Sequence, residues 1–450
     1  MQARGACPRG EIQMNQLASS PIALEKLLLL LCADIAIIIG AARFFGWLFG
    51  RIGQPPVVGE ILAGVILGPS LFGRLYPGAI RALLTRETTA ILSALAQIGL
   101  VLLMLLIGLE FPFDRMRHAA KSALLVAVAG ILVPFAASWA LAGPLFALAP
   151  GKSSEVAFKL FFATAVSITA IPIMGRILMH TRLTRTRMGL TSITAAALDD
   201  VLGWILLGVV FSTVTRGRAD LQWVLFSFVG VALLGATFWA AGRFGVTRMR
   251  IPRTEGGRLT SGALAIVLVV VFVTATATNA LGVFSIFGGF LCGVAGSFNK
   301  DLADAIKSSI GDLVAVLFLP IFFVFSGLRT DVGSLGSDPR LWLALLAVVV
   351  VACVSKFGAT TVAARISGLG WKESLSIGLL MNTRALMALV VINVGADLGV
   401  VSPPAFFWLV AMALFTTVIT TPILKRAYPS PEAVSWEPKK EVSGSKLDVQ

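Results

Sequence analysis

Apolar segments long enough to cross a membrane recur along this chain from Leu27 to Leu424. A helix needs about 20 consecutive apolar residues to span a bilayer, and helices satisfy their backbone hydrogen bonds internally. The pattern therefore predicts an all-α polytopic membrane protein with about thirteen transmembrane helices. Their approximate limits are 25–50, 55–72, 88–110, 119–142, 156–178, 187–214, 222–243, 260–279, 282–297, 303–328, 341–366, 373–396 and 404–425.

Composition supports this fold class. Of the 450 residues, 57% are hydrophobic and 13% are charged, whereas soluble domains carry roughly 25% charged residues. We expect residues 1–24 to be an N-terminal extension, 25–426 the transmembrane domain and 427–450 a disordered tail. No soluble domain and no cofactor are expected, so the function lies in the membrane.

The net charge of +14 is carried by basic residues in the short loops between the apolar segments. Such clusters anchor a protein on the inner side of a membrane. They predict contact with membrane lipid and no binding of nucleic acid. Their distribution favours an N-terminus outside and a C-terminus in the cytoplasm.

Two adjacent acids, Asp199 and Asp200, lie near the middle of the apolar stretch LTSITAAALDDVLGWILLGVV. An ionisable residue inside a span is a functional candidate by default. A buried carboxyl group can hold a proton, and once ionised it is a hard oxygen ligand for a small cation. Holding one or the other is the chemistry of exchange. A structural salt bridge or a helix cap is the alternative.

Neighbouring helical residues point about 100° apart, so the two acids cannot share one direction. One of them can pair with a protein cation while the other faces a cavity. Lys356 lies deep in the stretch LLAVVVVACVSKFGATTVAA. An unpaired lysine at that depth is costly, and we expect it to contact Asp199. A purely structural Lys356–Asp199 pair remains open.

Two apolar segments are interrupted by polar or helix-breaking residues. SITAIPIMGRIL contains Pro172, preceded by Ser167 and Thr169, and LLMNTRALMALVVINVG contains Asn382, Thr383 and Arg384. Interrupted segments in corresponding halves of a chain indicate an inverted-repeat transporter with broken helices. A simple proline kink is the alternative for the first segment.

Three further charged residues are secondary candidates. Glu60 belongs to a short segment bounded by Gly and Pro, while Glu110 and Arg329 end apolar segments. Charged groups at span ends usually anchor a helix at the membrane interface. We expect that role for Glu110 and Arg329.

These stretches together resemble the monovalent cation/proton antiporter family 2 of the sodium/hydrogen exchanger superfamily, with its plant and yeast relatives. The resemblance runs over about residues 25–426. It rests on GQPPVVGEILAGVILGPSLFG, LLMLLIGLE, SITAIPIMGRIL, AAALDDVLGW, FLPIFFVFSGLRTDV, SKFGA and GLLMNTRALMALVVINVG, which occur in family order.

The resemblance implies a homodimer in which a mobile core moves against a dimerisation domain. Segments 4–6 and 11–13 correspond to the core, segments 1–3 and 8–10 to the dimerisation domain, and the seventh to a linker. Broken helices five and twelve cross in the core. The resemblance makes Asp200 the carrier of the proton and of the metal ion, Na+ or K+. It pairs Asp199 with Lys356 and places Ser167 and Thr169 at the crossing.

Two departures from the family leave the choice of ion open. Plant relatives carry an acid where this chain has Ala388, and several potassium-handling relatives have Asn or Gln in place of Asp199. Paired acids resemble sodium-type members, whereas the flanking motifs resemble potassium-type members. Na+, K+ and Li+ all remain candidates.

We therefore expect a secondary transporter, not an enzyme, that exchanges a monovalent cation for protons in a bacterial inner membrane. A gated K+ efflux system or an organic-solute/H+ exporter is the alternative within this class. An intramembrane aspartyl protease also buries two aspartates, but its acids converge from different helices. Asp199 and Asp200 diverge from one helix, and the chain contains no GxGD sequence.

Overall fold

The computed structural model describes residues 21–78, 85–110, 113–169, 174–175, 177–178, 183, 186–216, 221–248, 252–254, 256–281 and 284–427. Within these ranges the chain is helical, with one isolated antiparallel bridge between Arg253 and Leu259. Pro172 and the expected tail after residue 427 lie outside the described residues, as does most of the expected N-terminal extension.

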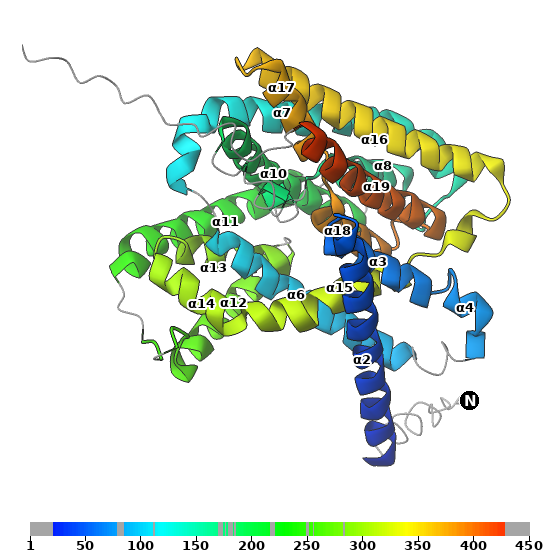
Figure 1. Cartoon of the computed structure of the whole chain (residues 1–450), viewed down its shortest axis with the longest axis horizontal. Coiled ribbons are helices and arrows are strands. Elements are labelled where there is room, and N and C mark those ends of the chain that lie inside the picture. Colours follow the sequence, from blue (N-terminus) through cyan, green and yellow to red (C-terminus); the bar gives the residue numbers. More distant parts are fainter. Residues whose placement is uncertain are drawn as a thin grey trace, which may run out of the picture.

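The helices form two bundles, which lie one above the other in Figure 1. The lower group is here called the first bundle. It contains α2 (Pro21–Arg51), α3 (Pro56–Leu67), α6 (Arg86–Leu109), α12 (Ser261–Ala280), α13 (Ser285–Gly296), α14 (Lys300–Leu313) and α15 (Leu319–Leu328). A π-helical turn, η3 (Val314–Phe318), joins α14 to α15, and the short α4 (Phe72–Leu75) follows α3.

The upper group in Figure 1 is here called the second bundle. It contains α7 (Phe113–Leu148), α8 (Glu155–Ser167), α10 (Arg187–Arg216), α16 (Pro339–Ile366), α17 (Trp371–Met381), α18 (Ala385–Asp397) and α19 (Pro403–Ala427). Helix α11 (Leu221–Ala240) packs on both α10 and α13, and it continues into η1 (Ala241–Gly245) and η2 (Val246–Arg248). A short 3-10 turn, η4 (Val332–Leu335), precedes α16.

About thirteen transmembrane helices were expected, with the fifth and twelfth broken, and the all-helical fold is confirmed. Within the described residues, 10 helices are long and apolar enough to cross a membrane. The fifth, ninth and twelfth expected segments contain shorter helices. The fifth is α8, which ends at Ser167, and the ninth is α13 with 12 residues. The twelfth is divided into α17 and α18.

Side-chain caps begin several of these helices. Ser154 Oγ accepts the Ala157 N–H at 3.3 Å before α8, and Asn299 Oδ1 accepts the Leu302 N–H at 3.1 Å before α14. The first N–H groups of a helix have no partner within it, and Ser and Asn side chains supply one. The polar residues between the apolar segments therefore set these helix starts.

Glycines bring helices of the first bundle into close contact. A Cβ atom on Gly64 in α3 would collide with the Val324 carbonyl of α15, and one on Gly293 in α13 would collide with the Leu105 carbonyl of α6. Small residues at helix crossings allow such backbone approach in membrane proteins. These pairs of helices therefore depend on glycine at the contact.

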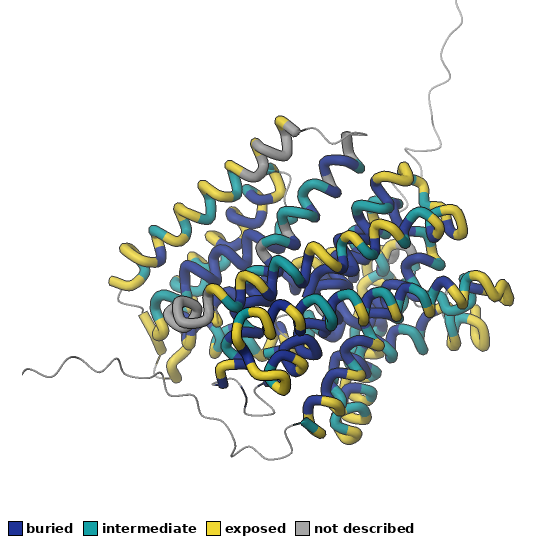
Figure 2. The backbone as a smooth tube through the Cα atoms, turned by 90° about the horizontal axis from the view of Figure 1, so that it is seen from above, coloured by how far each residue is buried: buried dark blue, intermediate teal, exposed yellow. Residues whose placement is uncertain are grey.

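Buried residues gather in the interior, and the outer faces of the helices are largely exposed (Figure 2). Many exposed residues are large and apolar, with exposures of 66–67% at Leu29, Ile266, Leu343 and Val354. Contiguous apolar surface of this kind indicates contact with another apolar phase. Together with the 10 candidate spans, it identifies an integral membrane protein.

Candidate functional site

Two chain interruptions meet inside the second bundle. Helix α8 ends at Ser167 and is followed by extended backbone at Ile168, while residues 382–384 separate α17 from α18. The Thr169 hydroxyl donates a hydrogen bond to the Met381 carbonyl at 3.0 Å. Ends of broken helices expose backbone groups that lack intrahelical partners. The structure thus brings the two expected breaks together.

Lys356 of α16 reaches the buried acid of α10. Its Nζ lies 3.0 Å from Asp199 Oδ2, and both side chains have 0% exposure. Lys356 Nζ also donates to the backbone carbonyl of Ser167, the last residue of α8. Carbonyls in the last turn of a helix need an outside donor. The lysine therefore joins α16, α10 and the break after α8, and the contact with Asp199 is the one expected from the sequence.

Asp200 follows Asp199 on α10 and differs from it in its contacts. The side chain is buried, with 4% exposure, and its Oδ1 has no hydrogen-bond partner among the described residues. Among the described residues, Asn382 Oδ1 is likewise a buried oxygen without a hydrogen-bond partner. Buried polar atoms normally have partners, so these oxygens require an explanation. Unpaired carboxylate and amide oxygens are the ligand type that hard cations prefer.

Arg384 lies in the break before α18 and is completely buried. Its Nη2 donates to the Ala352 carbonyl of α16 at 2.7 Å, and its Nη1 lies 3.4 Å from Met412 Sδ of α19. Ala352 is one turn before Lys356 on α16. A permanently charged guanidinium is thus fixed between α16 and α19 near the lysine that pairs with Asp199.

The other predicted crossing residues have local contacts. The Ser167 hydroxyl donates to the Ala163 carbonyl at 2.6 Å, so this residue reaches Lys356 through its backbone rather than its side chain. The Thr383 hydroxyl donates to the Leu380 carbonyl at 2.7 Å. Both hydroxyls satisfy carbonyls close to the ends of α8 and α17.

The secondary candidates lie outside this group of contacts. Glu110 ends α6 and pairs with Lys307 of α14 at 3.0 Å, within the first bundle. Glu60 of α3 lines a groove of about 480 Å³ together with Arg43 and Arg51 of α2. Among the described residues, the partners of the Lys356 ammonium group are Asp199 and Ser167, and neither Glu110 nor Glu60 is one of them.

Arg329 was expected to be an interfacial anchor, but the structure gives it specific partners in the other bundle. It ends α15, and its Nη2 lies 2.7 Å from Asp397 Oδ1 of α18. Its Nη1 donates to Asn393 Oδ1 at 3.3 Å. Sequence reasoning missed Asn393 and Asp397. The available signal was a single amide within the apolar run of α18.

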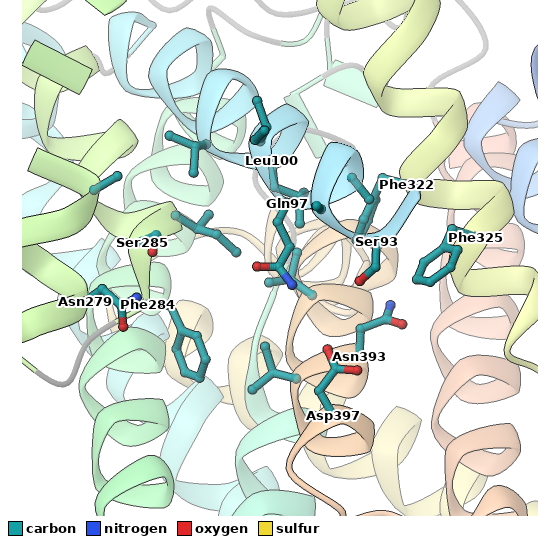
Figure 3. Close-up of a pocket in the computed structure, with 18 of the residues that line it drawn as sticks. Ser93, Gln97, Leu100, Asn279, Phe284, Ser285, Phe322, Phe325, Asn393 and Asp397 are labelled. Carbon is teal, nitrogen blue, oxygen red and sulfur yellow. The ribbon is translucent and has the colours of Figure 1, made fainter. Parts of the chain in front are cut away.

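A cavity of about 600 Å³ lies between the bundles, lined by α6, α12, α13 and α15 on one side and by α18 on the other. Figure 3 shows Ser93, Gln97, Asn393 and Asp397 around the same space. Neither Asp199 nor Asp200 is among the described residues that line it.

Comparisons with known proteins identify the family to which the chain is related. The chain is 38% identical over 414 residues to the Na(+)/H(+) antiporter NhaS4 of Synechocystis sp., covering 90% of this chain and 98% of that protein. It is 35% identical over 398 residues to cation/H(+) antiporter 18 of Arabidopsis thaliana, covering 88% of this chain. The match covers 48% of the plant protein, so the chain spans about half the length of that relative.

The fold is similar to that of the sodium proton antiporter MjNhaP1 from Methanocaldococcus jannaschii. The TM-score is 0.59 at 15% sequence identity, with 90% of this chain and 97% of that chain covered. Residues 39–427 match the family described as sodium/hydrogen exchanger, transmembrane. By this match and by the identity to its relatives, the chain belongs to the sodium/hydrogen exchanger family.

Proposed function

We propose that this protein is a secondary transporter that exchanges a monovalent cation, Na+ or K+, for protons across a membrane. The observation that carries the proposal is the buried Asp200, whose Oδ1 has no hydrogen-bond partner among the residues that the structure describes, beside the Lys356–Asp199 pair. Burying a carboxyl group favours its protonated form, while a cation at the same oxygens favours the ionised form. One site can therefore hold a proton or a cation in turn.

In this proposal Asp200 exchanges its proton for the cation. The crossing is surrounded by Thr169, by Asn382 and by backbone groups at the two breaks. These groups help to replace water around the ion. Arg384 stays charged and holds α16 through the Ala352 carbonyl. The expected kinetic consequence is competition, in which a lower pH raises the apparent KM for the cation.

Asp199 and Lys356 are proposed to take part in proton movement as well. A cation bound at Asp200 adds positive charge close to the Lys356 ammonium group, which favours release of a proton from Lys356. More than one proton then moves for each cation, and the cycle carries net charge. A transport rate that does not respond to an imposed membrane potential would contradict this stoichiometry.

The two bundles are proposed to move against each other by alternating access. The second bundle corresponds to the expected core, the first to the expected dimerisation domain of a homodimer, and α11 to the linker. The grouping of the helices supports this assignment, as does the position of α11 against both α10 and α13. The crossing breaks of α8 and α17–α18 are proposed to be the equivalent elements of an inverted repeat.

The proposed location is a bacterial inner membrane, with the N-terminus outside and the C-terminus in the cytoplasm. The distribution of charge supports this orientation. Arg253, Lys300 and Lys307 flank the segment 260–297, whereas the loop after Asn279 contains no Lys or Arg in the sequence. Basic residues favour the cytoplasmic side.

The test is a flux measurement in proteoliposomes with an acidic interior. Na+, K+ or Li+ is added outside, and the internal pH is followed for the wild type and for Asp200→Asn. We expect cation-driven alkalinisation that is lost in Asp200→Asn. The matched control is Asp34→Asn, since Asp34 is also a buried carboxyl residue in a span but belongs to α2 of the first bundle. This control should keep its exchange activity.

The outcomes separate the parts of the proposal. The cation that drives alkalinisation identifies the substrate. A response that survives Asp200→Asn would keep the exchange function but remove Asp200 as the carrier. No response to any of the three cations would overturn monovalent cation exchange and direct the search to organic solutes.

A further inference from the structure

We propose that Ser326, Arg329, Asn393 and Asp397 form a latch between α15 and α18 that must open and close in each exchange cycle. The inference rests on the proposed function, because it assigns residues to the movement between the two bundles. Arg329 and Asn393 are then positioning residues of the transport reaction rather than anchors at the membrane interface.

The latch consists of three polar contacts in a row. Arg329 Nη2 lies 2.7 Å from Asp397 Oδ1, and Arg329 Nη1 donates to Asn393 Oδ1 at 3.3 Å. The Asn393 amide donates in turn to Ser326 Oγ at 2.8 Å. The Asn393 amide oxygen thus accepts from Arg329, and its nitrogen donates to Ser326, so both polar atoms of this side chain contact α15 or the residue that follows it. Two arginine contacts and one serine contact hold a single face of α18.

These contacts join the bundles rather than stabilise one of them. Helix α15 packs on α2, α3 and α6 of the first bundle, whereas α18 packs on α8 and α19 of the second. Any sliding of the bundles therefore changes the distances within the latch. Polar contacts between two helices of the same bundle would keep their distances when the bundles slide.

Helix α18 connects the latch to the proposed ion site. It begins after Arg384, at the interruption that directly follows Met381, whose carbonyl accepts the Thr169 hydroxyl, and its last residue is Asp397. A helix of 13 residues is about 20 Å long. A rigid element of this length couples the latch at one end to the crossing at the other. Movement of the crossing must displace Asn393 and Asp397.

The cavity beside the latch offers space and alternative partners for the displaced groups. Figure 3 shows Asn393 and Asp397 at the cavity that Ser93 and Gln97 of α6 also line. Gln97 can donate to a carboxylate or accept from an amide, so it can replace the contacts that Arg329 releases. The partly exposed ion pair is also weak enough to break repeatedly, since the Arg329 and Asp397 side chains are 27% and 44% exposed.

The experiment joins the two sides of the latch with a short cleavable reagent. In a protein whose native cysteines, Cys7, Cys32, Cys292 and Cys353, are replaced by serine, Arg329→Cys and Asp397→Cys are cross-linked with a bis-methanethiosulfonate. The latch restrains the bundles and carries no ion, so we expect the double-cysteine variant without reagent to keep a measurable cation-driven proton flux. The cross-link should lower that flux to the value of empty vesicles, and reduction should restore it to the value before cross-linking. The proposal would be overturned if the fully cross-linked protein transported protons as fast as the same variant after the cross-link has been cleaved.

The matched control places the same reagent within one bundle. Glu110→Cys and Lys307→Cys replace the ion pair between α6 and α14. We expect that cross-link to leave the flux unchanged, since both helices move together. Loss of flux in this control as well would overturn the assignment, because a cross-link at any site would then be inhibitory.

A second readout does not require transport. Asn393 is 9% exposed, so a cysteine introduced by Asn393→Cys should react slowly with a maleimide in membranes. Adding Arg329→Ala should raise its labelling rate several-fold, whereas adding Glu110→Gln should not. An unchanged rate would overturn the latch even if exchange is established. A faster rate in a protein without cation-driven flux would keep the contact and reject the proposed function.

Discussion

The two bundles achieve close packing by different means. In the first bundle, Gly64 and Gly293 let backbones approach, and the interior is mostly apolar, with Asp34 as a buried carboxyl residue. The second bundle also has an apolar interior, but it contains Asp199, Asp200 and Lys356, and Arg384 is buried nearby. The two regions are thus built from similar helices, but among the described residues only the second bundle buries an acid and a lysine as an ion pair.

The difference between the two interiors indicates different roles for the two bundles. A buried ion pair often contributes less stability than a well-packed apolar substitute, so packing alone does not explain the charges of the second bundle. Glycine contacts, in contrast, serve packing directly. We infer that the first bundle supports the second, and that the polar interior of the second carries out the exchange.

The largest expected effect on stability compares two ion pairs of equal length. Lys356–Asp199 in the second bundle and Lys307–Glu110 in the first both have N–O distances of 3.0 Å. Asp199→Asn leaves a buried ammonium group without its anion, which costs roughly 3–5 kcal/mol. Glu110→Gln removes a partly exposed pair, which costs roughly 0–1 kcal/mol. The free energies of unfolding are compared by SDS titration in mixed micelles.

If the two substitutions lowered the free energy of unfolding by the same amount, burial would not explain the difference in stability expected between the two ion pairs. The double variant Asp199→Asn/Lys356→Gln provides the control for the unpaired charge. It should recover part of the stability that Asp199→Asn loses, because the two residues are coupled. It should not recover exchange.

The next effect concerns glycine in the first bundle. Gly64→Ala places a methyl group against the Val324 carbonyl, and we expect a loss of about 1–3 kcal/mol from overpacking. Gly40→Ala in α2 is the matched control, since its added Cβ would meet no atom within 4 Å. It should be neutral or stabilising by up to about 1 kcal/mol, because alanine favours helix. SDS unfolding measures both.

If the first bundle only supports the site, Gly64→Ala should lower stability without changing which cation drives exchange. The same preparations are reconstituted for flux measurements with Na+, K+ and Li+. A change in the preferred cation would show that the first bundle shapes the ion site and would break the proposed division of roles.

The smallest effect tests the crossing. Thr169→Val removes the hydrogen bond to the Met381 carbonyl, which typically contributes about 0.5–1.5 kcal/mol. We expect a small loss of stability together with a clear rise in the KM for the cation. Thr237→Val is the control, because Thr237 is exposed on α11 and donates only to Leu233 of its own helix. A normal KM for Thr169→Val would exclude the crossing contact from ion binding.

Much of the architecture could be predicted from the order of apolar and polar residues. The thirteen segments each contain helix in the described residues, and ten of them coincide with a stretch long and apolar enough to cross a membrane. Segment length follows from the local sequence, so the spans were predictable. The exact end of α8 at Ser167 was not, because Lys356 satisfies the Ser167 carbonyl from 189 residues away.

The candidate site shows the same limit. The sequence indicated that Lys356 needed an acid, and it marked the polar interruption at Asn382, Thr383 and Arg384. It gave Glu110 and Arg329 the same role, because each ends an apolar segment. The structure separates them, since Glu110 pairs within the first bundle and Arg329 pairs with the second.

The sequence by itself determined that this chain spans a membrane, where its helices lie and which charges are too deep to be incidental. Hydrophobic transfer and the cost of buried charge act on each segment, so a one-dimensional pattern records them. Tertiary structure decided which carboxylate Lys356 contacts, which oxygens stay unpaired and which helices Arg329 joins. Those outcomes depend on distances between segments far apart in the chain, and only the packing of the two bundles sets them.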